Sequence, residues 1–137
     1  MTRAIKQFTI NTKGFTDIID ITANINSIIL NSGITEGLAT IYAAGSTVSI
    51  SSIEYEPGLI EDLPELMNKL IPHDVDYKHD QKWHDGNGYA HLRSSLIGNS
   101  YTVPIIDRHL ELGTWQQVIL IDFDNKPRTR KITVVIV

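Results

Sequence analysis

The chain contains no cysteine, which excludes disulfide bonds, thiolate metal sites and cysteine nucleophiles. Aromatic residues are scarce at 7%, and no apolar run approaches the roughly 20 residues that a membrane-spanning helix needs. Positive charge is in deficit, since 12 Lys and Arg stand against 16 Asp and Glu, a formal net charge of −4. A chain that is acidic and has no basic stripe is expected to bind neither nucleic acid nor an anionic membrane.

The N-terminal sequence MTRAIKQFTI has no long apolar core and so differs from a signal peptide. With 137 residues, of which 42% are hydrophobic and 20% charged, the chain has the length and composition of one globular domain. We therefore expect a single domain over residues 1–137, in a cytoplasmic protein without a membrane partner.

The spacing of apolar residues predicts two main helices. Isoleucines at helical spacing indicate a helix over 20–32 that ends at Gly33, and a leucine stripe indicates another over 58–71. Pro64 lies inside the second pattern, where it would kink the helix or mark its true first turn. Residues 72–88 are expected to form a polar loop, and 89–97 fit a short helix or a strand.

The remaining segments have the alternation and β-branched content of strands. They are residues 4–12, 37–44, 47–55, 100–106, 109–112, 115–123 and 128–137, with a hairpin turn at Asp107 and Arg108. Helices and strands that do not alternate regularly indicate an α+β domain with a mainly antiparallel sheet or sandwich. Because the last two strands are apolar on both faces, we expect another subunit to cover one face.

Three of the five histidines, His79, His84 and His91, lie within thirteen residues of one another. Imidazole nitrogens bind zinc or other divalent ions, and they exchange protons near neutral pH. The spacing of these histidines matches no fixed metal motif, so the fold would have to gather them, with Asp80 or Asp85 orienting a ring. The alternative is that they are loop histidines with local hydrogen bonds.

Asn87 and Gly88 belong to the segment Asp85–Gly88, whose glycines permit positive φ angles. Such a loop can direct backbone N–H groups at a phosphate, or it can be a plain turn. Arg93, a few residues further on, can pair with phosphate through its planar guanidinium or can lie on the surface.

Trp115 and Gln116 precede the apolar strand over 115–123. Trp115 would stack on a heteroaromatic ring while Gln116 reads its polar edge, or the indole would cover the sheet end or a subunit interface.

Two aspartates and two arginines occupy the ends of the last two strands. Asp122 and Asp124 flank Phe123, so alternation places both carboxylates on one side, and Arg128 and Arg130 likewise share a side. The four groups predict either a cross-strand ladder of ion pairs or an anion site built from the two arginines.

Several segments together resemble the YjbQ-like family, small proteins long described as uncharacterised and also called secondary thiamine-phosphate synthase-like. The matching segments run in order over nearly the whole chain: EYEPGLIEDL (54–63), YKHD (77–80), DGNGYAHLRSSLIG (85–98), TVPIID (102–107), LELGTWQQVILIDFD (110–124) and PRTRKITV (127–134). The resemblance implies an α+β fold, a homotrimer and a weak thiamine-phosphate synthase activity. That reaction joins a pyrimidine diphosphate to a thiazole phosphate and releases pyrophosphate.

For this enzyme hypothesis we assign roles to residues in or near the matching segments. Catalysis is assigned to His79, Asp80, His91 and Ser94, and substrate binding to Asn87, Gly88, Gly98, Trp115, Gln116, Arg128 and Arg130. A divalent ion, Mg²⁺ or Zn²⁺, would help the arginines to neutralise pyrophosphate, with His79, His84 and His91 as its candidate ligands.

The chain departs from the family at one position. Many members carry His-Thr-Thr before the acidic stretch, where this chain has Gly45, Ser46 and Thr47. The missing histidine favours an alternative hypothesis, in which a non-catalytic trimer binds a metal or a small phosphorylated or heteroaromatic ligand without turnover.

Overall fold

The computed structural model describes residues 3–137. Along the chain it contains β1 (Ala4–Thr12), β2 (Asp17–Asp20), α1 (Thr22–Ser32), β3 (Gly37–Ala43), β4 (Val48–Glu54), α2 (Pro57–Leu70), α3 (Lys78–Trp83), α4 (Gly88–Ile97), β5 (Ser100–Ile106), β6 (His109–Leu110), β7 (Gln116–Asp122) and β8 (Arg128–Ile136). The predicted α+β class is confirmed. Within residues 3–137, every helix is too short or too polar to cross a membrane.

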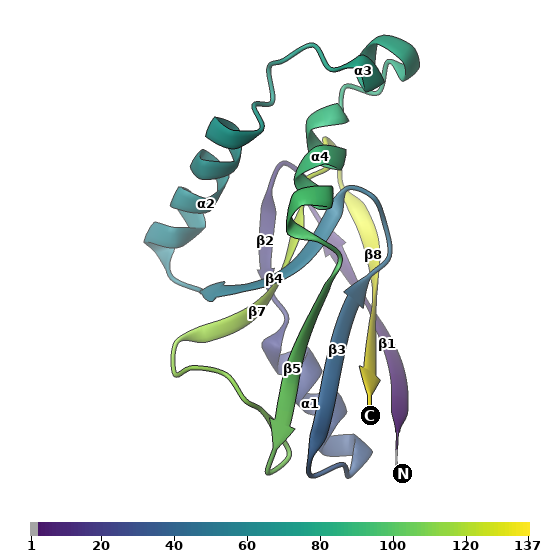
Figure 1. Ribbon diagram of the computed structural model, residues 1–137, viewed down its shortest axis with the longest axis vertical. Coiled ribbons are helices and arrows are strands. Elements are labelled where there is room, and N and C mark those ends of the chain that lie inside the picture. Colours follow the sequence, from purple (N-terminus) through teal and green to yellow (C-terminus); the bar gives the residue numbers. More distant parts are fainter. Residues whose placement is uncertain (1–2) are drawn as a thin grey trace.

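The strands form two antiparallel sheets, a five-stranded sheet in the order β1-β8-β3-β5-β6 and a three-stranded sheet in the order β2-β7-β4. In Figure 1, α1 lies at the end of the molecule where both termini are found, while α2, α3 and α4 gather at the opposite end. Since β7 and β8 belong to different sheets, the turn between them carries the chain from one layer to the other.

Strand β7 is the centre of the fold because both of its faces are buried. Val118 and Leu120 pack in one core with the isoleucines of α1 and the five-stranded sheet. Ile119 and Ile121 face a second core that contains Met67 of α2 together with residues of α4. The expectation that another subunit covers one face is therefore wrong for β7, since α2 and α4 of the same chain cover it.

Both predicted helices are confirmed, with local reasons for their ends. Helix α1 ends at Gly33, which adopts φ 72°, a left-handed conformation that favours glycine. Helix α2 begins at Pro57, and the Glu56 carboxylate accepts hydrogen bonds from the N–H groups of Gly58 and Leu59. Pro64 lies inside α2, so it does not mark the first turn.

Two short elements were not predicted. Helix α3 occupies six residues of the expected loop over 72–88, and β2 contributes four residues to the smaller sheet. Neither is long enough to show a periodic pattern. The ambiguous segment 89–97 is helical, as part of α4. The predicted hairpin is confirmed: Asp107 and Arg108 have φ 50° and 68°, and Ile106 pairs with His109.

Candidate functional site

A buried ion pair lies between the end of β7 and the start of β8. Because Ile121 and Phe123 point toward α2 and α4, alternation turns Asp122 toward the five-stranded sheet. There Arg130 donates from Nε to Oδ2 of Asp122 at 2.7 Å and from Nη2 to Oδ1 at 2.9 Å. Thr12 of β1 donates to the same carboxylate at 2.6 Å. This bidentate geometry fixes the arginine fork relative to both sheets.

Asp124 is the second buried carboxylate and accepts from four groups. The donors are Arg128 Nε at 2.8 Å, the Asn125 backbone N–H at 2.8 Å, Thr47 Oγ1 at 3.1 Å and Asn87 Nδ2 at 3.2 Å. Burial raises the pKa of Asp124, but hydrogen bonds from Asn87, Asn125 and Arg128 and the charge of Arg128 outweigh it and lower the pKa to about 2. Asp124 is therefore an anion at any physiological pH.

Asn87 connects this anion to a histidine. Its Nδ2 donates to Asp124, so its Oδ1 is the acceptor that faces Nε2 of His79 at 3.1 Å. An ionised carboxylate can only accept, and this requirement fixes the orientation of the Asn87 amide. His79 must then carry a proton on Nε2, which leaves Nδ1 of the neutral ring as a proton acceptor.

His79 and His91 form a pair, with ring centroids 4.5 Å apart and ring planes tilted by 55°. His79 comes from α3 and His91 from α4. Burial and the neighbouring His79 lower the pKa of His91, against the opposing effects of Asp124, the Ser46 backbone and Asp85. His91 is therefore a neutral imidazole at pH 7, the form that can accept a proton.

Gly88 permits the close contact between α3 and α4 that brings the histidines together. A Cβ at this position would lie 2.8 Å from Cβ of Tyr77, so only glycine fits. The Gly88 N–H donates to Oδ1 of Asp80 at 2.9 Å. This donor is therefore used within the chain, where Asp80 anchors the start of α4.

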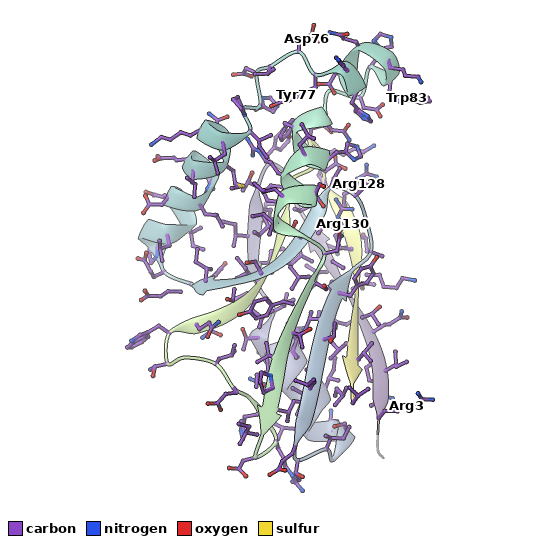
Figure 2. The ribbon with its side chains drawn as sticks, in the orientation of Figure 1. Arg3, Asp76, Tyr77, Trp83, Arg128 and Arg130 are labelled. Atoms are coloured by element: carbon purple, nitrogen blue, oxygen red, sulfur yellow. The ribbon has the colours of Figure 1, made fainter. Side chains whose placement is uncertain are left out.

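Two clefts flank His91. The first, which we call the tyrosine cleft, has a volume of about 320 Å³ and is lined by Tyr77, Lys78, His79, Gly88, His91 and Leu92. The second, which we call the glycine cleft, has a volume of about 470 Å³ and is lined by Gly45, Ser46, His91, Leu92, Ser94, Ser95 and Asn99. Figure 2 shows Arg128 and Arg130 in the same half of the molecule as Tyr77, away from Arg3.

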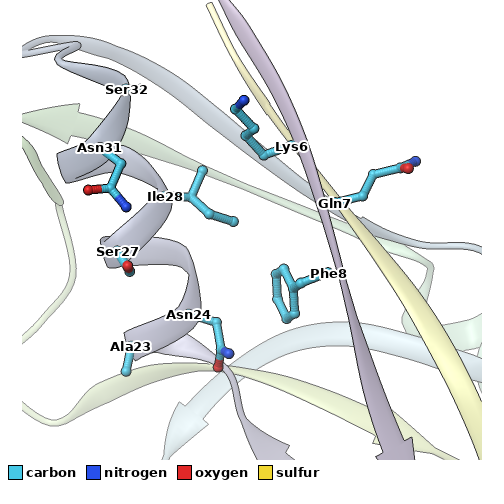
Figure 3. Close-up of a pocket in the computed structure, with 9 residues that line it drawn as sticks. All are labelled: Lys6, Gln7, Phe8, Ala23, Asn24, Ser27, Ile28, Asn31 and Ser32. Carbon is cyan, nitrogen blue, oxygen red and sulfur yellow. The ribbon is translucent and has the colours of Figure 1, made fainter.

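A larger groove of about 650 Å³ lies elsewhere, between β1 and α1 (Figure 3). Its polar lining consists mainly of amide and hydroxyl groups from Gln7, Asn24, Ser27, Asn31 and Ser32, and Lys6 is its one titratable side chain. Because these groups include no acid or base that titrates near neutral pH, the histidine clefts are the better candidate for a site that moves protons.

A family model described as UPF0047 protein YjbQ-like matches residues 6–137. The chain belongs to this family. A UPF0047 protein of Archaeoglobus fulgidus is 39% identical over 93% of this chain and 97% of its own length. YugU of Bacillus subtilis is 34% identical over 92% of this chain and 93% of its own length.

Solved structures agree with the YjbQ-like assignment. A crystal structure from Sulfolobus solfataricus, described as a YbjQ-like protein of unknown function, superposes with a TM-score of 0.89 at 30% identity over 98% of both chains. An uncharacterised YjbQ/UPF0047 protein of Clostridium acetobutylicum gives a TM-score of 0.88 at 32% identity over 96% of this chain and 99% of its own. These comparisons establish the family and its fold, and the function of the family remains uncharacterised.

Other residues assigned from the YjbQ-like resemblance lie apart from the histidine pair. Trp115, 71% exposed, and Gln116 lie at the opposite end of β7 from Asp122, a separation of roughly 20 Å for a seven-residue strand. Gln116 donates to Ser52 Oγ and to the Tyr101 hydroxyl. The structure therefore does not bring Trp115 and Gln116 to the predicted substrate site.

Three further predicted residues have structural contacts. Ser94 is buried, and its hydroxyl donates to the Val48 carbonyl at 2.6 Å, which ties α4 to β4. Gly98 ends α4 with φ 92°. The surface alternative for Arg93 is wrong, because the side chain is buried and donates to the Ile71 carbonyl and to Thr16.

The three-histidine metal set is not assembled. His84 caps the C-terminal end of α3 in a left-handed conformation, while His79 and His91 pair without it. Among residues 3–137, no three His, Asp or Glu side chains lie close enough together to hold a metal ion. The protein groups therefore do not fit a zinc site of three or four ligands.

The ion-pair prediction is confirmed in chemistry but wrong in geometry. Asp122 and Asp124 do point to one side and pair with Arg130 and Arg128. The Asp122–Arg130 pair joins the two sheets and the Asp124–Arg128 pair spans the turn between them, so the pairs do not form a ladder within one sheet. The residues missed from the sequence are Thr12, Thr47 and Lys78. Thr12 and Thr47 lie far along the chain from the aspartates that they contact, and no local signal marks them.

The lowered pKa of Asp124 predicts a specific acid sensitivity. Its ionised form stabilises the fold fully above about pH 4, and this contribution is lost as the pH falls from 3.8 toward 2. The loss is about 2 kcal/mol in the free energy of unfolding. We expect Asp124→Asn to flatten the pH dependence of urea unfolding in this window and to lower stability at pH 7. Asp74→Asn, at a 96% exposed side chain, is the control.

The orientation of Asn87 predicts the tautomer of His79. Imidazole ¹⁵N NMR above pH 8 should show the proton on Nε2 of His79, and Asn87→Ala should produce a mixture of tautomers. A signal for protonated Nδ1 in the unsubstituted protein would contradict the assigned orientation of Asn87.

Proposed function

We propose that the clefts beside His91 bind a small phosphorylated or heteroaromatic ligand, and that His91 exchanges a proton with it. The observation that carries this proposal is the connected series Asp124, Asn87 and His79, which ends at His91. Two hydrogen bonds orient Asn87 and then His79, and the His79 ring packs against that of His91 with centroids 4.5 Å apart. Such fixed orientation is what a proton-transfer site requires. This series distinguishes His79 from a loop histidine with only local hydrogen bonds, which would not be linked through Asn87 to a buried carboxylate.

The reaction that we propose for this site is thiamine-phosphate synthesis, which the resemblance to the YjbQ-like family implies. A bond forms between the thiazole nitrogen and the methylene carbon of the pyrimidine, while the carbon–oxygen bond to pyrophosphate breaks and its electron pair leaves with pyrophosphate. Forming this bond transfers no proton between the two halves, so the proton that His91 exchanges is one that it takes from the bound diphosphate and returns to the departing pyrophosphate. The leaving group needs positive charge or hydrogen-bond donors. Lys78, His79 and His91 line the tyrosine cleft, whose surface is almost entirely apolar, so their N–H groups would have to turn toward pyrophosphate when it binds.

The alternative is a ligand-binding protein without turnover. This alternative is favoured because Arg128 and Arg130 already form ion pairs within the protein, with Asp124 and Asp122 respectively. A paired cation neutralises a departing pyrophosphate less well than a free one. The two functions make different predictions for the same experiment.

We expect thiamine phosphate to form from the two phosphorylated halves in the presence of Mg²⁺, and His91→Ala to slow it by a factor of about 100 or more. The control is His109→Ala, which removes an exposed histidine of the hairpin. Product is measured by chromatography and binding of each half by calorimetry.

Two results would change the assignment. Binding of a half without turnover, weakened in His91→Ala, would favour the ligand-binding protein and exclude the synthase. If neither half bound to the unsubstituted protein, both functions would be excluded.

We also propose that the chain forms a homotrimer through the outer face of the five-stranded sheet. Ile5, Leu38, Ile106 and Val137 are 45–63% exposed, and they lie on β1, β3, β5 and just after β8. The Leu38 and Val137 backbones are hydrogen-bonded to each other, so their side chains belong to one patch. Apolar side chains grouped on one sheet face are typical of a protein interface.

Sedimentation equilibrium should give three times the chain mass of 15.4 kDa. We expect Leu38→Glu to shift the mass toward a single chain, because a carboxylate buried at the interface is unpaired. Leu96→Glu, on an exposed position of α4, is the control. A single-chain mass for the unsubstituted protein would exclude the trimer.

A further inference from the structure

Arg93 is a buried cation without an anionic partner. It is 3% exposed, and its guanidinium donates to two neutral oxygens, the Ile71 carbonyl and the Thr16 hydroxyl. By contrast, the buried Arg130 forms an ion pair with Asp122. Within the described part of the chain, no carboxylate lies within 4 Å of the Arg93 guanidinium. Removing an unpaired ion from water is costly, so this arginine lacks a counter-charge that a buried cation normally has.

The end of helix α2 offsets only part of this charge. Ile71 is the C-cap of α2, and its carbonyl accepts from Nε and Nη2 of Arg93 at 3.0 and 2.8 Å. A helix C-terminus carries roughly half of an elementary negative charge, whereas the guanidinium carries a full positive charge. Nη1, the remaining nitrogen, donates to the uncharged Thr16 hydroxyl at 3.1 Å. Capping of α2 therefore explains one edge of the arginine and leaves net positive charge at the other.

A cavity of about 150 Å³ lies beside this guanidinium. Its lining includes Tyr89 and Arg93 of α4, Asn68 of the last turn of α2, and Thr16 of the turn between β1 and β2. The guanidinium borders the cavity, because Nη1 contacts Thr16 and Cζ lies 4.9 Å from the centroid of the Tyr89 ring. Tyr89 and Arg93 are four residues apart and share one side of α4, while His91 lies on the other side. The cavity is therefore separate from both clefts beside His91.

The polar groups of the lining have spare donors. Thr16 Oγ1 accepts from Arg93, so its own proton can be donated elsewhere. Oδ1 of Asn68 accepts from the His73 backbone N–H at 3.2 Å, while Nδ2 makes no hydrogen bond within the described chain. The lining contains no carboxylate among the described residues; Asp74 contacts Nδ1 of His73, but its side chain is 96% exposed. A cation and two spare donors without an acceptor suit an oxyanion.

Two further features mark this region. The Tyr89 hydroxyl is a buried side-chain group that has no hydrogen-bond partner within the described chain. Phe15 and Thr16 have φ 55° and 62°, values that a β-branched residue such as threonine rarely adopts. The strained turn is held from inside, since the Phe15 N–H donates to the Asp124 carbonyl at 2.7 Å. Backbone strain of this kind is typical of binding sites, and here it adjoins the unpaired cation.

We propose that this cavity binds a small oxyanion, a carboxylate or a phosphate group. The anion lies beside Arg93 as its counter-charge and accepts from the Thr16 hydroxyl and the Asn68 amide. The cavity has the volume of about five water molecules, at about 30 Å³ each, so the anion has only a few heavy atoms. Phe15 and Pro64 give the rest of the lining an apolar character. The site goes beyond the proposed function and does not depend on it.

Propionate and inorganic phosphate are the probes, titrated by calorimetry at constant ionic strength. We expect at least one of them to bind the unsubstituted protein, and Asn68→Asp to weaken that binding at least tenfold, because a carboxylate at the cavity repels a second anion. Asn31→Asp is the matched control. It also places an aspartate at an exposed position in the last turn of a helix, α1, and anion affinity should stay within twofold.

A measurement on the unsubstituted protein locates the anion directly. The bound anion should shift the guanidinium ¹⁵N resonances of Arg93 and leave those of Arg130 unchanged, because Arg130 is already paired with Asp122. Binding of propionate alone would assign the site to carboxylates, and binding of phosphate alone to phosphate groups. Failure of both anions to bind, or equal affinity in Asn68→Asp, would overturn the site. Binding that is lost in His91→Ala and retained in Asn68→Asp would place the anion in the histidine clefts and would also overturn it.

Discussion

Two carboxylates buried at the end of β7 hold the site together. Asp122 and Asp124 are fully buried, and burying unpaired carboxylates would cost several kcal/mol each. Their partners come from several parts of the fold: Thr12 from β1, Thr47 from the turn before β4, and two arginines from β8. The two sheets and their connecting turns must therefore meet in one arrangement to satisfy these charges.

A buried ion pair is weak evidence for stability, because desolvation offsets much of the attraction between the charges. Its consequence here is orientation. Asp124 remains ionised and can only accept, so Asn87 must turn its amide nitrogen inward and its oxygen toward His79. The buried carboxylate thus determines, through Asn87, which nitrogen of the half-buried His79 carries the proton at the tyrosine cleft. The neutral His91 beside it completes a pair that is oriented before any ligand arrives.

The sequence allowed the elements to be predicted better than their placement. Alternation correctly put Asp122 and Asp124 on one side, because the two-residue period of a strand is local. Trp115 and Gln116 were expected in the substrate site from their side-chain chemistry and from the family resemblance, but they lie at the opposite end of β7 from Asp122. Helix α3 was missed because six residues show no period, although it carries His79. Thr12 and Thr47 could not be found, since their role depends on contacts between sheets.

The two clefts share His91 yet differ in their lining, and this difference bears on the ligand. The tyrosine cleft offers an almost entirely apolar surface, made by an aromatic ring, the aliphatic stem of Lys78 and the rings of the histidine pair. The glycine cleft is more polar, with three serines and Asn99 among its lining residues. A ligand that spans both would place its ring and its phosphate on opposite sides of a neutral imidazole. Such a molecule matches either half of thiamine phosphate, and it would be bound in the same way whether or not the protein goes on to join the halves.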